Sequence, residues 1–151
     1  MTIEVIKSRF RSAGGEGDFA WMIEQPQYSR ALFLFNDNEE EFYTHFKGGQ
    51  HRCGIGGGNA GIRPYQCRTP QQAVGIPTGS RGAGYARLDA HVRSVLDDAF
   101  SQIDRLLATG YYDSVIFSWD DTTKLGGRIF NTAQDVRDDI VERILATAAG
   151  H

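Results

Sequence analysis

Two glycine-rich stretches in the middle of the chain carry the residues best suited to hold an anionic ligand. They are Gly56-Gly57-Gly58-Asn59, which is followed by Arg63, and Thr78-Gly79-Ser80-Arg81-Gly82. Glycine lets backbone N–H groups approach a ligand closely and adopt positive φ, so several amides can converge on one phosphate. The guanidinium groups of Arg63 and Arg81 would supply the matching charge. Each stretch taken alone is equally typical of a flexible surface loop.

The distribution of charge along the chain favours the anion-site interpretation. The net charge is −3, but from residue 42 to residue 88 the chain has no Asp or Glu. The basic residues of this acid-free segment are Lys47, Arg52, Arg63, Arg68, Arg81 and Arg87. Because the glycines fall in the same segment, we expect a cationic ligand pocket there. The alternative is an ordinary solvated basic surface.

Aromatic and acidic side chains near these stretches extend the list of candidates. Tyr65, Tyr85, Phe117 and Trp119 offer faces on which a nucleobase can stack, although Phe117 and Trp119 are equally typical of a core. The acids Asp37, Asp120 and Asp121 can position water, or they are solvated loop residues. A serine nucleophile is not supported, because the chain has no G-x-S-x-G elbow.

The cysteines and histidines offer a weak metal signal. His45, His51, Cys53 and Cys67 follow the spacing H-x5-H-x-C-x13-C, which lacks the paired C-x-x-C of most structural zinc sites. We therefore expect no metal and no cofactor. Two cysteines do not make a disulfide framework, and in a reducing cytosol we expect both to be free thiols.

The hydrophobic pattern supplies the elements that position these residues. Alternation predicts strands over residues 3–10 and 19–24, which we expect to pair as a hairpin or edge pair. Short apolar runs predict buried strands at 31–35, 73–76 and 114–119, and helices are expected over 39–47, over 85–107 and from about 132. Apolar strands alternating with helices predict one three-layer α/β domain over 1–151, with a mixed, mostly parallel central sheet flanked by helices. Its parts are a strand pair (1–25), a ligand-binding core (31–130) and a C-terminal helix (132–148).

In such sheets the ligand crevice lies beyond the carboxyl ends of the strands. Three of these ends are Asn36-Asp37-Asn38, Pro77-Thr78-Gly79 and Trp119-Asp120-Asp121. The second leads through Gly82 and Gly84 towards the helix expected from Tyr85, a place where free amides and the positive helix end can surround a diphosphate.

The order of these motifs resembles the macro domain, the ADP-ribose-binding fold. In the residues of these motifs, the chain is most similar to uncharacterised, phage-associated macro-like proteins. The motifs are Phe35-Asn36-Asp37-Asn38, Gly57 to Arg63, Gly75-Ile76-Pro77-Thr78 and Leu125-Gly126. The resemblance covers residues 31–130. It implies that the ligand-binding residues are Asn36, Asp37, Asn38, Gly56, Gly57, Gly58, Asn59, Arg63, Thr78, Gly79, Ser80, Arg81, Gly82, Tyr85 and Trp119.

The resemblance implies binding of ADP-ribose or a related, cyclic or linear, nucleotide, and a role in sequestering a host immune signal for a phage. Hydrolytic macro domains carry an acid after the glycine loop, where this chain has Asn59-Ala60-Gly61, so capture without turnover is favoured. The alternative is an ADP-ribosyl or ADP-ribose-phosphate hydrolase that uses Asn38, Asp37 and Asp120.

Composition limits the other classes. The longest apolar run, 31–35, is too short to span a membrane, and the charged start of the chain does not resemble a signal peptide, so we expect a cytoplasmic protein. Acidic pairs at 97–98 and 138–139 interrupt any basic face, which disfavours a nucleic-acid partner. Self-association is left open.

Overall fold

The computed structural model describes residues 2–47, 53–127 and 130–151. It is an α/β fold built on a curled, mostly parallel sheet with the strand order β1-β5-β2-β3-β4. The strands are β1 (Glu4–Ser8), β2 (Ala31–Asn38), β3 (Ala73–Ser80), β4 (Ala83–Gly84), β5 (Ser114–Asp120) and β6 (Lys124–Leu125). The two shortest, β4 and β6, are antiparallel to β3 and β5. The predicted class and the three buried strands are confirmed.

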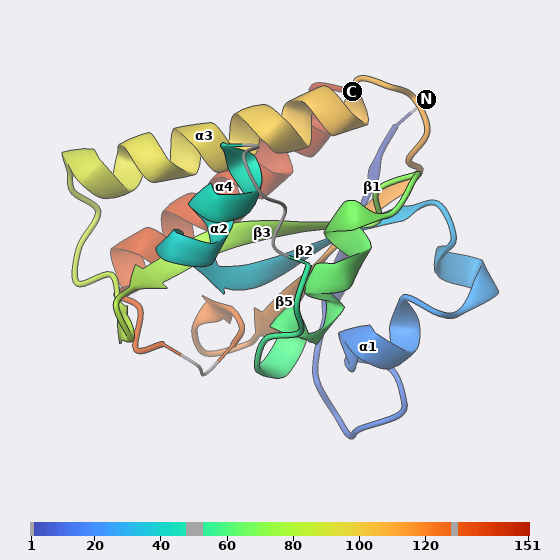
Figure 1. Ribbon diagram of the computed structural model, residues 1–151, viewed down its shortest axis with the longest axis horizontal. Helices are drawn as coiled ribbons and strands as arrows, with labels where there is room; N and C mark the ends of the chain where they lie inside the picture. Colours follow the sequence, from blue (N-terminus) through green and yellow to red (C-terminus); the bar gives the residue numbers. More distant parts are fainter. Residues whose placement is uncertain (1, 48–52, 128–129) are drawn as a thin grey trace.

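Helices cover both faces of the sheet. They are α1 (Phe19–Met22), α2 (Glu39–Phe46), α3 (Ala90–Leu107) and α4 (Gln134–Ala149), with two 3₁₀ helices, η1 (Pro26–Tyr28) and η2 (Gly58–Cys67). Figure 1 shows α3 and α4 side by side on one face, and α1 and η2 on the other. None of the helices in the described ranges is long and apolar enough to cross a membrane.

Alternation along the central strands divides the core in two. In β2, Leu32 and Leu34 belong to the first core, beneath α3 and α4, whereas Phe33 and Phe35 belong to the second core, with α1 and η2. Successive side chains of a strand point to opposite faces, so one apolar run serves both layers. This explains why β2 is almost continuously apolar.

The N-terminal prediction is wrong in both element type and pairing. Residues 19–22 form a helix, because the Asp18 side chain caps it by accepting from Ala20 N–H at 3.1 Å and because Phe19 and Met22, three residues apart, are both buried. A short apolar run does not distinguish helix from strand by itself. In place of a hairpin, β1 pairs in parallel with β5 at the sheet edge.

Two further boundaries shift. Both β2 and β3 run through their polar ends to Asn38 and Ser80, so these ends belong to the sheet and not to the following turns. The long helix begins at Ala90 and not at Tyr85, because Asp89 caps it by accepting from Val92 N–H at 2.9 Å. The turn after β3 therefore leads into β4 and not directly into a helix.

Candidate functional site

A cavity of about 950 Å³ opens beyond the carboxyl ends of the parallel strands, where the crevice is predicted. The predicted residues that line it come from β2, from the glycine turn (residues 56–59), from the rest of η2, from β3 and from β5. They are Asn36, Asp37, Asn38, Gly56, Gly57, Gly58, Asn59, Arg63, Thr78, Trp119 and Asp120. The volume lies at the upper end of the range for small-molecule sites.

The cavity also has walls that the sequence patterns miss. One comes from the segment after β1, with Arg9 and Phe10. The other comes from the segment between β5 and α4, where Gly127 and Phe130 join Asp121 and Gly126, which the sequence motifs already include. The first was missed because β1 was expected in a hairpin and not beside β5. The signal that could have found both walls is their position directly after a parallel strand.

The glycine turn leads into η2 and lines the cavity. Gly58 has a φ of +56°, a conformation that glycine adopts readily, and Gly56 N–H donates to the Ala60 carbonyl at 3.0 Å, which closes the turn. The first N–H groups of a helix have no acceptor within it, so those of Gly58 and Asn59 are suited to an external acceptor. A Cβ on Gly56 would lie 2.6 Å from Arg63 Nη1, so this turn also lies against Arg63.

Arg63 is already neutralised inside the protein. Its Nη2 donates to Asp37 Oδ1 at 2.5 Å, and the two side chains are 8% and 1% exposed. Burial raises the pKa of Asp37, although Arg63 and the Asn38 N–H oppose that shift. The buried pair uses the charge of Arg63 to join β2 to η2, so a phosphate would compete with Asp37 for this guanidinium. The assignment of Arg63 as a phosphate partner stays a prediction.

The β3–β4 turn, predicted to hold a diphosphate, binds a carboxylate of the protein itself. Arg81 N–H donates to Glu40 Oε1 at 2.6 Å, and the Ser80 hydroxyl donates to Glu40 Oε2 at 2.9 Å. Burial works against the charge on Glu40, but these hydrogen bonds outweigh it and hold the pKa of Glu40 below its usual value. Within the described ranges, Gly79, Ser80, Arg81, Gly82 and Tyr85 do not line the cavity.

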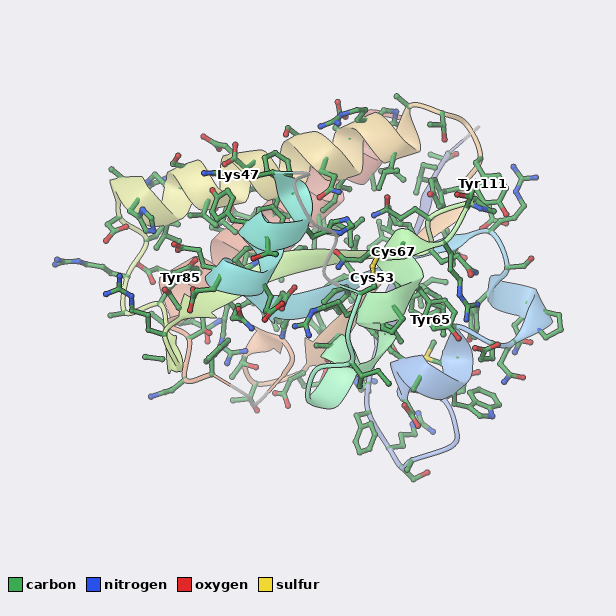
Figure 2. All side chains as sticks on the ribbon, in the orientation of Figure 1. Lys47, Cys53, Tyr65, Cys67, Tyr85 and Tyr111 are labelled. Atoms are coloured by element: carbon green, nitrogen blue, oxygen red, sulfur yellow. A yellow bond between two sulfur atoms is a disulfide. The ribbon has the colours of Figure 1, made fainter. Side chains whose placement is uncertain are left out.

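Glycine in this second stretch serves packing. A Cβ on Gly84 would lie 2.5 Å from the backbone of Asn131, and one on Gly79 would overlap the Ala83 carbonyl and the Phe130 ring. Tyr85 donates from its hydroxyl to Glu39 Oε1 at 2.7 Å, beneath α2. Figure 2 shows Tyr85 at the left of the view, away from the disulfide near its centre. These contacts make the turn an element of the fold, and its assignment as a ligand cradle stays a prediction.

The lining of the cavity is of mixed charge and not cationic. Its acids are Asp18, Asp37, Glu41, Asp120 and Asp121, and its described bases are Arg9, Arg63 and Arg137. The described part of the acid-free segment supplies one arginine, Arg63, to this lining, and the acids come from the flanking chain. Folding therefore mixes charges that the sequence keeps apart, which corrects the prediction of a cationic pocket.

Arg137, on α4, holds the wall between β5 and α4. Its guanidinium donates to four backbone carbonyls, those of Leu125 (2.5 Å), Thr132 (3.0 Å), Gly127 (3.3 Å) and Phe130 (3.3 Å). Asn36 adds a bond from Nδ2 to the Gly126 carbonyl at 2.6 Å. This wall is fixed by two polar side chains from other elements, and its position depends on both.

Aromatic side chains lie at the cavity mouth. Phe10 is 64% exposed, so its ring is accessible to a ligand, and Trp119 donates from its indole N–H to Asp121 Oδ1 at 3.0 Å. Arg9 also binds Asp121 Oδ1, at 2.6 Å, in an exposed pair. Of the other predicted stacking residues, Phe117 is buried in the first core and Tyr65 in the second, so both are core residues.

The cysteines form a disulfide, Cys53–Cys67, with a Cα–Cα distance of 6.1 Å (Figure 2). The expectation of free thiols is wrong for this structure, because folding of η2 brings the two residues together. In this state neither sulfur is a thiolate that could bind zinc. Of the remaining members of the zinc pattern, His45 is buried in α2 and His51 lies outside the described residues.

Comparisons with protein-family models, with curated proteins and with solved structures find no match for this chain. The resemblance to macro domains therefore rests on the motifs themselves.

Proposed function

We propose that the cavity captures a nucleotide of the ADP-ribose class, without turning it over. The observation that carries this proposal is the combination, in the lining of one cavity of about 950 Å³, of a glycine turn at the start of η2 and the exposed aromatic ring of Phe10. Amides suit a diphosphate and the ring suits a base. Both features lie at the carboxyl edge of a parallel sheet, where such ligands bind in other α/β proteins.

The phosphate contacts in this proposal differ from those expected from the sequence. The N–H groups of Gly58 and Asn59 replace Arg63 as the diphosphate donors, because Arg63 is committed to Asp37. Among the described residues of the lining, Arg9 is a cation available to the ligand, since its pair with Asp121 is exposed on both sides and such pairs contribute little. A phosphate that enters the cavity can therefore replace Asp121 as the partner of Arg9 with little loss of free energy.

Calorimetry tests the proposal. Titration of the folded protein with ADP-ribose and with cyclic ADP-ribose isomers should release or absorb heat at a stoichiometry of about one for at least one of these ligands. The isomers are included because the resemblance to phage macro-like proteins implies a cyclic signal. Absence of heat with every ligand, from protein shown to be folded, would contradict the proposal.

Replacing Phe10 by Ala is expected to weaken nucleotide binding about tenfold with little change in stability. Stacking of a base on an aromatic ring contributes roughly 1–3 kcal/mol, and the exposed Phe10 side chain adds little to the core. Leu145→Ala is the matched control, because Leu145 is also exposed (42%) but lies on α4 outside the described cavity lining. Equal nucleotide affinity of the two variants would show that Phe10 does not contact the ligand.

The hydrolase alternative rests on Asp37, whose pKa is raised by burial and whose Oδ2 has no hydrogen-bond partner among the described residues. A carboxyl with a raised pKa can act as a general acid. Against it, Asp37 is 1% exposed and bound to Arg63, and the Asn38 side chain is engaged as the cap of α2. Release of phosphate from ADP-ribose 1″-phosphate, lost in Asn38→Ala, would favour the hydrolase over capture.

A further inference from the structure

The disulfide Cys53–Cys67 brackets the glycine turn of the candidate site. Its two cysteines are 14 positions apart, and the residues between them include Gly56, Gly57, Gly58, Asn59, Ala60 and Arg63, which all line the cavity. Cys67 is the last residue of η2 (Figure 2). The covalent bond thus closes a loop whose opposite end forms one wall of the cavity.

The two limbs of this loop are held by different forces. The η2 limb is anchored by packing, since Ala60, Ile62 and Tyr65 belong to the second core and Arg63 is paired with Asp37. The Gln66 side chain also accepts a hydrogen bond at its Oε1 from Gly75 N–H of β3, at 3.3 Å. This limb would stay in place without the disulfide.

The limb from Cys53 to Gly57 has much weaker attachments. Gly54 and Ile55 are exposed, and Ile55, at 77%, does not pack into a core. Its described hydrogen bonds are a long one from Arg63 Nη1 to the Gly54 carbonyl (3.3 Å), the bond from Gly56 N–H to the Ala60 carbonyl and the return bond from Ala60 N–H to the Gly57 carbonyl (3.1 Å). The main chain joins this limb to η2 at Gly58, and the disulfide fixes its other end, Cys53, to the last residue of η2.

We propose that Cys53–Cys67 is a redox modification site through which a small dithiol reductant, or a dithiol protein, loosens the glycine turn and weakens ligand binding. The bond is within reach, because Cys67 is exposed and Cys53 is partly exposed. The effect on the ligand rests on the proposed function. The effect on the turn does not.

The chemistry is thiol–disulfide exchange. A reductant thiolate attacks Sγ of Cys67, the S–S bond breaks, and Sγ of Cys53 leaves as a thiolate that takes a proton from solvent. The second thiol of the reductant, once deprotonated, attacks the mixed disulfide and releases Cys67 as a thiolate, which is also protonated. The reductant becomes a disulfide, and two electrons pass to the protein. An oxidant of the disulfide class reverses the reaction.

Hydrogen exchange read by mass spectrometry tests the proposal without any ligand. The wild-type protein is compared before and after reduction with dithiothreitol, and a Cys53→Ser/Cys67→Ser double variant serves as the control. Reduction is expected to speed exchange of the Gly56 and Ala60 amides at least tenfold, to leave β2 and β5 unchanged, and to have no effect on the double variant. Unchanged exchange at these amides, or two free thiols in protein purified under oxidising conditions, would overturn the proposal.

Calorimetry with ADP-ribose on the two wild-type forms then separates this proposal from the function. The reduced form is expected to bind about tenfold more weakly than the oxidised form. Binding of equal strength by both forms would overturn the link between the disulfide and the site. Binding by neither form would contradict the proposed function, while the exchange result would still decide whether the disulfide controls the turn.

Discussion

Arg63→Met is expected to lower the free energy of unfolding by about 3–5 kcal/mol at neutral pH, because it leaves the buried carboxylate of Asp37 without its partner. Asp37 is 1% exposed and its Oδ2 already lacks a hydrogen-bond partner among the described residues, so water cannot easily compensate. Chemical denaturation of the two proteins at the same pH measures the difference.

The loss should depend on pH in a defined direction. The pKa of Asp37 is raised above the ordinary 3.8 in the folded protein, so its contribution to stability is fully present below that value and is lost as pH rises through the folded-state pKa. Arg63 opposes this shift, so its removal raises the pKa of Asp37 further. The deficit of Arg63→Met is therefore expected to be smaller at pH 4 than at pH 8. A deficit that does not change with pH would contradict this assignment.

The double variant Asp37→Asn/Arg63→Met is the control for this pair. It removes both charges at once, so no unpaired charge remains buried, and it should be more stable than Arg63→Met alone. If the double variant is as unstable as the sum of the single changes, the two side chains act independently and the pair does not join β2 to η2.

Arg137→Met is expected to destabilise the protein by about 3 kcal/mol and to loosen the wall between β5 and α4. The change removes a charged donor from four carbonyls, and hydrogen bonds to charged groups contribute about 1.5–3 kcal/mol each, without being additive. Denaturation measures the stability, and hydrogen exchange over 120–127 and 130–133 measures the loosening. Because Gly127 and Phe130 line the cavity, nucleotide affinity should fall with it.

Arg143→Met is the matched control on the same helix. Arg143 pairs with Asp97 at 2.6 Å and with Asp139 at 2.8 Å, but Asp97 is 68% exposed, so the loss is expected to stay below about 1 kcal/mol. An effect of Arg143→Met as large as that of Arg137→Met would show that any arginine on α4 matters equally. It would remove the special role of the carbonyl contacts.

The successes and errors of prediction at the site have a common physical basis. Asn36, Asp37 and Asn38 were placed at the cavity because the end of an apolar strand is visible in the sequence and parallel strands end at one edge. Arg81 lies outside the described lining, and its N–H is taken by Glu40, 41 residues away. The sequence of a glycine-rich turn does not show whether its N–H groups bind a ligand or a side chain of the protein itself.

By itself, the sequence determined the buried strands, the helices α2 and α4 and the edge of the sheet at which a cavity forms, because these follow from periodicity and capping among neighbouring residues. Only the tertiary structure decided which polar groups meet. Arg63 pairs with Asp37, 26 residues away. Ser80 and Arg81 donate to Glu40, which is 40 and 41 residues away, and Cys53 bonds to Cys67, 14 residues away. A buried charge or donor takes the best partner that packing brings near it, and that partner is set by the fold and not by distance along the chain.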